Sequence, residues 1–285
     1  MTREITLDGP PDLRRVYASA VRRRGAAGDT LPDVRCSRTG VRVDVDELVA
    51  YARVCRFDVG GDLPVTYPHL LAFPLQLTVM AGEGFPLPLL GAVHVENRIE
   101  VVRPVGTDEV LDVTVRAQDL RPHRRGRQVD LVSEVAVAGE VVWRGVSTYL
   151  ARGAEHPDAP ASDPPDLGAL AGVAGGPTWR LGAGTGRAYA AVSGDWNPIH
   201  VHALTARPLG LPSAIAHGMY TYARVLASLG PRLPLHGLTS RVWFRRPVRL
   251  PSTVTLRSAV EPHRTLSVLR SAAGDVEHAV VENTW

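Results

Sequence analysis

The most informative stretch of the chain is Tyr189-Ala-Ala-Val-Ser-Gly-Asp-Trp-Asn-Pro-Ile-His200, which is followed by Ile215-Ala-His-Gly-Met219. Asp195 and His200 flank an Asn-Pro turn, so the chain reverses between them and both side chains can reach one point in space. Gly218 opens an apolar run that predicts a buried helix with free N–H groups at its start. A carboxylate, an imidazole and a helix start on such short segments are the components of an acid-base site.

The second half of the chain, which contains this stretch, repeats the sequence segments of the first half in the same order. Tyr51-Ala-Arg-Val-Cys55 matches residues 189–193, and residues 68–75 match residues 212–219. Arg103-Pro-Val likewise matches Arg246-Pro-Val, each expected inside a β-type run. Two copies of one α+β unit follow from this internal repeat.

Hydrophobic patterning predicts the elements of the first copy. A helix is expected from Asp44 to Cys55, and a central apolar helix from Leu70 to Met80. Four β-type runs follow at Ala92–Val102, Glu109–Ala117, Gln128–Ala138 and Glu140–Leu150, with a basic loop at Arg121–Arg127. In the second copy, the corresponding central helix is expected at Met219–Leu229.

The repeat also predicts the domain boundaries. Residues 1–150 form an N-terminal unit with an extension, and residues 178–285 form a C-terminal unit that carries the site. Residues 151–177 are rich in Ala, Pro, Gly and Asp, and this composition is typical of a linker.

The two copies differ chemically at the site. Asp195, His217 and Gly218 correspond to Phe57, Phe73 and Pro74, and His200 lies in a longer segment without a clear counterpart. The first copy therefore cannot perform the same chemistry. We expect a shared pocket in which the second copy supplies catalysis and the first copy shapes apolar space for a substrate.

Composition and patterning exclude several other classes. A formal net charge of only +3 is far from the concentrated basic face of a nucleic-acid binder, so no nucleic-acid partner is expected. The longest apolar segment, Leu70–Met80, is too short to span a membrane. Cys36 and Cys55 match no metal-ligand spacing, and the N-terminus lacks a signal-peptide core. These features predict a cytoplasmic protein with free thiols.

The residues between Tyr189 and Met219 resemble the signature of the MaoC-like hydratase/dehydratase family, the (R)-specific enoyl-thioester hydratases. The resemblance implies a double hot-dog fold, in which each unit has a long central helix wrapped by a curved antiparallel sheet. It also implies a hydro-lyase that reversibly hydrates trans-2-enoyl thioesters of coenzyme A or acyl carrier protein to (R)-3-hydroxyacyl thioesters. No metal and no redox cofactor are expected. The two copies make the chain an internal pseudo-dimer. A homodimer of two whole chains stays an open alternative.

Carried over onto this chain, the resemblance makes Asp195 and His200 the catalytic pair and the backbone N–H of Gly218 the oxyanion donor. The remaining predicted substrate-site residues are Ser193, Asn197, His217 and Arg207. For Ser193 the expected role is packing and a hydrogen bond, and for Arg207 a contact with a phosphate of coenzyme A. The chain departs from many relatives at His202, where they have an acidic residue.

Several alternatives stay open on the residues alone. The fold also suits an acyl-thioesterase or a non-catalytic acyl-binding or scaffold subunit. His200 and His202 with Asp195 or His217 form no known zinc pattern, so a metal site is disfavoured. Gly182-x-Gly-x-Gly186 is a weak dinucleotide-like pattern that reads better as loop or helix-cap glycines.

Overall fold

The computed structural model describes the chain except for residues 1, 14, 18–27, 90, 174 and 208–209. Its contacts divide it into two compact units. The first unit comprises residues 1–43 and 67–162, and the second unit comprises residues 44–66 and 163–285.

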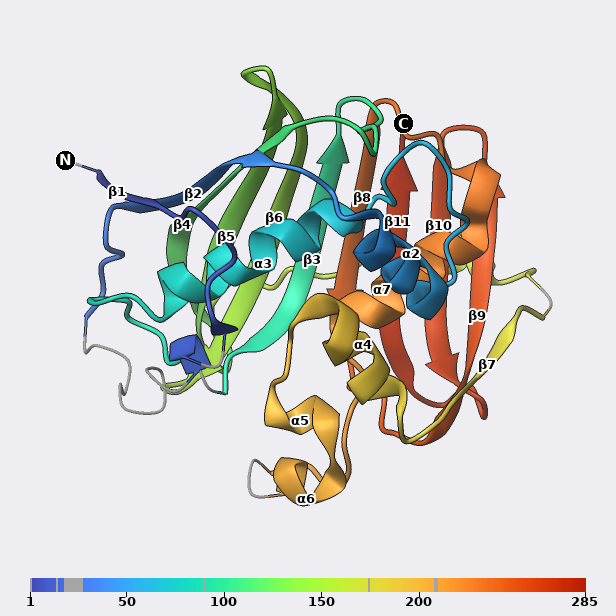
Figure 1. Cartoon of the computed structure of the whole chain (residues 1–285). Coiled ribbons are helices and arrows are strands. Elements are labelled where there is room, and N and C mark those ends of the chain that lie inside the picture. Colours follow the sequence, from blue (N-terminus) through green and yellow to red (C-terminus); the bar gives the residue numbers. More distant parts are fainter. Residues whose placement is uncertain (1, 14, 18–27, 90, 174, 208–209) are drawn as a thin grey trace. The chain divides into compact units, whose positions relative to one another are not determined.

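In the described part of the first unit, one sheet packs with one long helix, α3 (Figure 1). Its strands are β1 (Arg3–Thr6), β2 (Val34–Val41), β3 (Val93–Val101), β4 (Leu111–His123), β5 (Gly126–Val137) and β6 (Glu140–Arg152). They lie in the order β1-β2-β4-β5-β6-β3, and all pairs are antiparallel except β1 with β2. Helix α3 (Tyr67–Met80) contacts β2, β4 and β5.

Helix α3 confirms the predicted central helix and begins three residues earlier than expected. Ten of its fourteen residues are buried, so it has no polar face and is suited to the inside of a curved sheet. Pro74 lies in its middle and lacks the N–H that would continue the helical bonds. The Thr78 hydroxyl donates to the Pro74 carbonyl at 2.9 Å.

The second unit has the same plan with additional short helices. Its elements are α2 (Val45–Cys55), β7 (Thr178–Leu181), α4 (Thr185–Ser193), α5 (Pro198–Val201), α6 (Ala203–Ala206), α7 (Gly218–Leu229), β8 (Leu238–Phe244), β9 (Ser252–Glu261), β10 (Arg264–Ser271) and β11 (Glu277–Thr284). The strand order is β8-β11-β10-β9-β7, and every pair is antiparallel.

The internal repeat is confirmed by this topology. The order β2-β4-β5-β6-β3 in the first unit matches β7-β9-β10-β11-β8 in the second, strand for strand. Two details of the prediction were wrong. Arg103 and Arg246 lie in the loops after β3 and β8 and not inside strands, and most of the expected basic loop Arg121–Arg127 extends β4 and β5 into a hairpin.

A buried polar pair shows that the repeat extends to side chains. On adjacent strands of the first unit, the Asn97 amide donates to the Ser147 hydroxyl at 2.9 Å. At the corresponding places of the second unit, the hydroxyl of Ser240 donates to the amide oxygen of Asn283. The amide and the hydroxyl have exchanged strands, and because both partners changed together the buried hydrogen bond is kept.

Helix α2 precedes α3 in the chain but belongs to the second unit. Asp44 caps it by accepting from the N–H groups of Asp46 and Glu47. Its fully buried Tyr51 lies 6.4 Å from the ring of Tyr189 on α4 and hydrogen-bonds to Thr66 at 2.7 Å. The division by contacts thus differs from the predicted boundaries at 150 and 178, which follow the repeat and remain a proposal.

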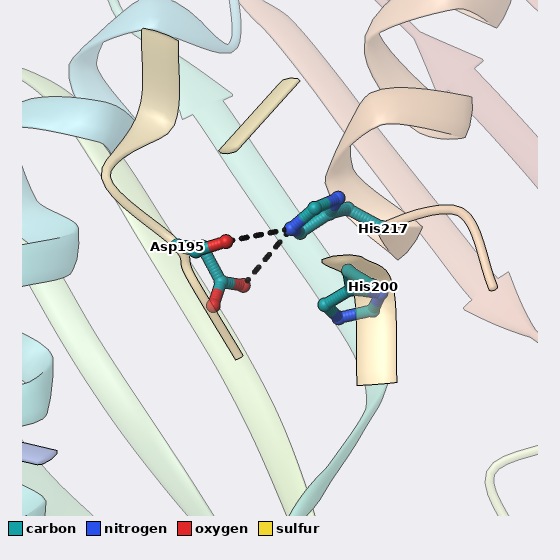
Figure 2. A group of neighbouring side chains, drawn as sticks. All are labelled: Asp195, His200 and His217. Atoms are coloured by element: carbon teal, nitrogen blue, oxygen red, sulfur yellow. Dashed lines mark hydrogen bonds and ion pairs between the residues drawn. The ribbon is translucent and has the colours of Figure 1, made fainter. Parts of the chain in front are cut away.

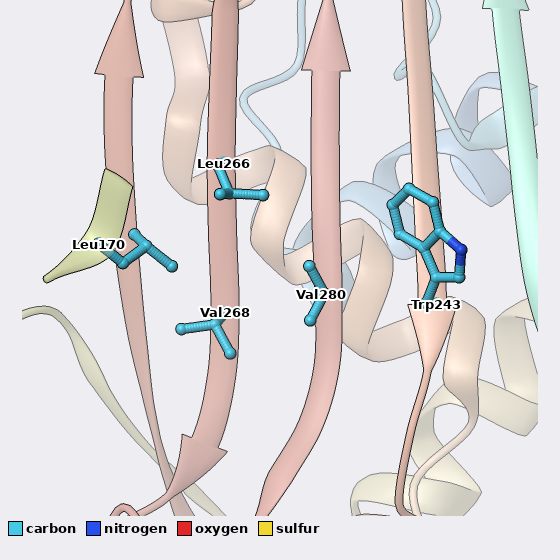
Figure 3. Packing of buried hydrophobic residues seen from close by; sticks show 5 residues of the cluster. All are labelled: Leu170, Trp243, Leu266, Val268 and Val280. Atoms are coloured by element: carbon cyan, nitrogen blue, oxygen red, sulfur yellow. The ribbon is translucent and has the colours of Figure 1, made fainter. Parts of the chain in front are cut away.

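The predicted linker covers part of a sheet. Its 3-10 helix η1 (Gly168–Leu170) places Leu170 against four buried residues of the second unit, namely Trp243, Leu266, Val268 and Val280 (Figure 3). Leu167 and Val173 pack against the same cluster. Three apolar residues at a spacing of three therefore bury an apolar sheet face that would otherwise contact water.

Two further expectations concern membrane-spanning helices and the cysteine thiols. Across the described residues, no helix is both long and apolar enough to cross a membrane. Cys36 and Cys55 are free and buried, and burial raises the pKa of the Cys36 thiol to about 11. Neither is a reactive thiolate near neutral pH.

Candidate active site

The site lies in the second unit, where three segments of the predicted motif converge (Figure 2). Asp195 follows α4, His200 lies on α5, and His217 is the residue before α7. One ligand atom from each of the three side chains lies within 4.8 Å of the others. The predicted convergence of Asp195 and His200 is present, and the side chain of His217 lies beside both of them.

Local hydrogen bonds fix the loop that carries Asp195. Helix α4 ends at Gly194, whose φ of 73° is accessible to glycine without strain. The Asp195 N–H donates to the Ser193 hydroxyl at 3.2 Å, and the Asn197 N–H donates to the Asp195 carboxylate at 3.1 Å. Asp195 is thus braced as in an Asx turn, with 21% of its side chain still exposed.

His200 is held by both its helix and its ring. Asn197 caps α5 by accepting from the Ile199 N–H at 3.3 Å, and Pro198 occupies the first turn. The Nδ1 atom of His200 lies 2.9 Å from the carbonyl oxygen of Ile215. Since a carbonyl only accepts, Nδ1 carries the proton and Nε2 presents a lone pair. Burial lowers the pKa of His200, which favours this neutral form.

His217 connects the other two residues. Its Nε2 donates to the Asp195 carbonyl at 2.9 Å, and its ring stacks on that of His200 with centroids 3.7 Å apart. Burial and the neighbouring His200 lower the pKa of His217 to about 3. The ring is therefore neutral near pH 7, and its 3.7 Å approach to the Asp195 carboxylate is not an ion pair.

The hydrogen bonds of Asp195, His200 and His217 also indicate how well these residues could hold a metal ion. An Asp and two His residues are a donor set that divalent transition metals accept. The nitrogen of His217 that faces Asp195 already carries a proton and donates it to a main-chain carbonyl. Metal binding would have to break that bond, so the residues fit proton transfer better than a metal.

Gly218 is the first residue of α7, and the N–H groups of this first turn have no acceptor within the helix. A Cβ at this position would lie 3.0 Å from two ring atoms of Phe244. A side chain at this position would therefore press on Phe244, a reason for glycine that only the fold reveals.

The other predicted site residues have local partners or are exposed. Ser193 and Asn197 form the hydrogen bonds described above, and a contact of either with substrate stays a prediction. Arg207 is exposed at the end of α6. His202 caps α6, since its Nδ1 accepts from the Leu204 N–H at 3.1 Å, a role that an acidic residue can also fill.

Sequence reasoning missed the role of Gly186. This glycine lies in α4, and a Cβ there would overlap the main-chain carbonyl oxygen of His200. Gly186 therefore lets α5 approach α4 closely. The glycine pattern from Gly182 to Gly186, read as loop or cap glycines, contains one residue on which the segment that carries His200 packs.

The two units of matching strand order define a double hot-dog protein, and Asp195, His200 and His217 converge in its second unit. Residues 183–282 match the MaoC-like domain family. The 3-hydroxyacyl-thioester dehydratase X of Mycobacterium tuberculosis is 38% identical over 232 residues, which cover 80% of this chain and 81% of the relative. This chain therefore belongs to the MaoC-like dehydratase family, as the sequence resemblance predicted.

Two further comparisons agree with this assignment. An (R)-specific enoyl-CoA hydratase of Rhodospirillum rubrum is 32% identical over 100 residues, covering 33% of this chain and 69% of the relative. The crystal structure of HtdX from Mycobacterium tuberculosis superimposes with a TM-score of 0.76 and 34% identity, covering 87% of this chain and 98% of the other. The predicted double hot-dog fold is confirmed.

Proposed function

We propose that this chain interconverts trans-2-enoyl thioesters and (R)-3-hydroxyacyl thioesters by reversible addition of water. The observation that carries the proposal is the convergence of Asp195 and the neutral His200 on one point beside the start of α7. The names of the dehydratase and hydratase relatives support the reaction class.

The catalytic pair handles the protons. The Asp195 carboxylate accepts a proton from water as the water oxygen bonds to Cβ, while the Nε2 lone pair of His200 orients that water. A proton is returned to Cα by the same pair, so both transfers occur on one face of the substrate. No electrons are exchanged with a cofactor, because water adds across the double bond without net oxidation.

The start of α7 handles the developing charge. Addition at Cβ places enolate-like charge on the thioester oxygen, and the Gly218 N–H is the donor aimed at it from a helix N-terminus. Preorganised donors of this kind contribute about 3 to 4 kcal/mol to the rate. The acyl group is carried by coenzyme A or acyl carrier protein, and Arg207 is a candidate contact to a phosphate of coenzyme A.

The test is hydration of crotonyl-CoA, followed by loss of the enoyl-thioester absorbance. Asp195→Asn keeps an oxygen for the Asn197 N–H bond while removing the base, so the fold is expected to persist and kcat to fall by several orders of magnitude. A folded Asp195→Asn protein that hydrates at nearly the wild-type rate contradicts the proposal. A panel of enoyl-CoAs of increasing chain length then defines the substrate range.

The same assay separates the other functions of this fold. A thioesterase releases free thiol, which a thiol reagent detects, and leaves the double bond intact. A scaffold subunit binds enoyl-CoA without turnover. Either result in the wild-type protein would replace the hydratase assignment.

A further inference from the structure

The segment of the chain that carries the site is strongly asymmetric in charge. Between Asp166 and Glu261 the chain contains ten arginines and a single acidic residue, which is Asp195. Three of these arginines, Arg245, Arg246 and Arg249, lie in one loop after β8, and all three are exposed. We refer to residues 245–249 as the arginine loop.

The arginine loop is fixed beside the segment that leads into Gly218. The Ala216 N–H donates to the Val248 carbonyl at 2.8 Å, and Arg249 forms a β-bridge with Ile215, whose carbonyl holds His200. On its other side, the N–H groups of Arg245 and Arg246 donate to the His278 carbonyl. The loop therefore has a defined backbone position next to the proposed oxyanion donor.

The corresponding loop of the first copy contains an internal ion pair. There, Arg103 donates two hydrogen bonds to the Glu109 carboxylate at 3.1 and 2.8 Å. The Glu109 carboxylate also accepts from the Gly106 N–H at 2.7 Å. This arginine is neutralised within its own loop.

In the second copy the neutralising residue is gone. Arg246 corresponds to Arg103, and the positions of Gly106 and Glu109 are taken by Arg249 and Ser252. The buried Oγ of Ser252 has no hydrogen-bond partner in the described part of the chain. One carboxylate has been lost and one guanidinium gained at equivalent backbone positions.

The remaining charges do not compensate. Within the described ranges, neither Arg246 nor Arg249 forms an ion pair, and Arg245 reaches the exposed Asp163 only at 4.0 Å. Guanidinium groups without a carboxylate partner are suited to bind phosphate, often through two parallel hydrogen bonds. We propose that the arginine loop binds a phosphate group of the carrier to which the acyl thioester is attached. This inference rests on the proposed function and extends it to the carrier.

The experiment compares substrates with and without phosphate. Arg246→Gln and Arg249→Gln are assayed with crotonyl-CoA and with the crotonyl thioester of N-acetylcysteamine, which carries none. Loss of a charge-assisted hydrogen bond predicts that kcat/KM falls about tenfold to a hundredfold on the CoA substrate and stays unchanged on the phosphate-free one. Equal losses on both substrates, or no loss on crotonyl-CoA, overturn the proposal. A wild-type protein that hydrates no member of the enoyl-CoA chain-length panel contradicts the proposed function itself.

Two further substrates identify which phosphate is bound, and two further variants test the loop itself. Crotonyl-dephospho-CoA and a crotonyl-acyl carrier protein distinguish the ribose 3′-phosphate from the phosphate nearest the pantetheine. Ser252→Glu restores the carboxylate of the first copy, and we expect it to neutralise Arg246 and reproduce the loss on crotonyl-CoA. Arg257→Gln removes an exposed charge on β9 and is the control. A loss in Arg257→Gln equal to that in Arg246→Gln assigns the effect to general charge and overturns the loop as a site.

Discussion

The imidazole rings of His200 and His217 lie 3.7 Å apart, at an angle of 26° between their planes. Each ring donates to a different main-chain carbonyl, that of Ile215 for His200 and that of Asp195 for His217. Two protonated imidazoles could not share this contact, because like charges at such a distance repel strongly in a buried site. The stack therefore excludes the state in which both rings are protonated, which makes the site sensitive to acid.

The first prediction concerns the rate. Burial lowers the pKa of His200 below its ordinary value of 6.5, and the proposed mechanism uses its unprotonated Nε2. We expect the acid limb of a plot of log kcat/KM against pH to bend below pH 6.5. Steady-state hydration rates between pH 4 and 8 measure this bend. A bend above pH 6.5 that disappears in His200→Gln would contradict the prediction.

The second prediction concerns stability. His217 has a pKa of about 3 when folded and an ordinary value of 6.5 when unfolded. Its contribution is complete above about pH 6.5, because neither state is protonated there. As the pH falls toward 3, only the unfolded chain binds the proton, so the free energy of unfolding falls by up to about 1.4 kcal/mol per pH unit.

Urea denaturation at several pH values checks this slope. His217→Gln removes the titrating ring while keeping a donor for the Asp195 carbonyl, and should show a shallower loss of stability between pH 6 and 4. His263→Gln changes an exposed histidine in the same unit and should retain the wild-type slope. Identical slopes in His217→Gln and the wild type would show that His217 does not titrate in this way.

The third prediction concerns Gly218. A methyl group in Gly218→Ala would press on the Phe244 ring from 3.0 Å, and we expect a loss of about 1 to 3 kcal/mol in stability together with a lower kcat. Phe244→Leu in the same chain should recover part of the stability, since it removes the crowding. A double-mutant cycle of the four proteins measures the coupling, and strictly additive effects would argue against this contact.

The fourth prediction concerns Gly186. In Gly186→Ala the new Cβ would overlap the carbonyl oxygen of His200, so α5 must move away from α4. We expect a large drop in kcat, since His200 moves with α5, and a loss of stability. Gly182→Ala is the matched control, because nothing lies within 4 Å of its Cβ. Similar activity in the two variants would remove Gly186 from the positioning of the site.

The sequence predicted the site to the extent that local spacing determines it. Asp195 and His200 converge as their short spacing predicted, although Asn197 and Pro198 begin helix α5 and do not form the expected reversing turn. The repeat predicted both central helices and the matching strands. The stacking of His217, the packing of Phe244 on Gly218 and the approach of α5 at Gly186 depend on segments that meet only in the fold. Such contacts leave no periodic pattern. The segment that carries Leu167, Leu170 and Val173 was predicted only as a linker, so its packing on the sheet was also missed.

Helix α2 has a consequence for any attempt to produce the catalytic half separately. A gene fragment that starts at residue 163 would encode the complete family-matching region, residues 183–282, together with Asp195, His200 and Gly218. It would still lack Tyr51 and the rest of α2, so Tyr189 on α4 would lose its contact with the Tyr51 ring. The second unit therefore depends on a helix encoded in the first half of the chain, and we expect a fragment that begins at residue 163 to be less stable than the second unit of the whole chain.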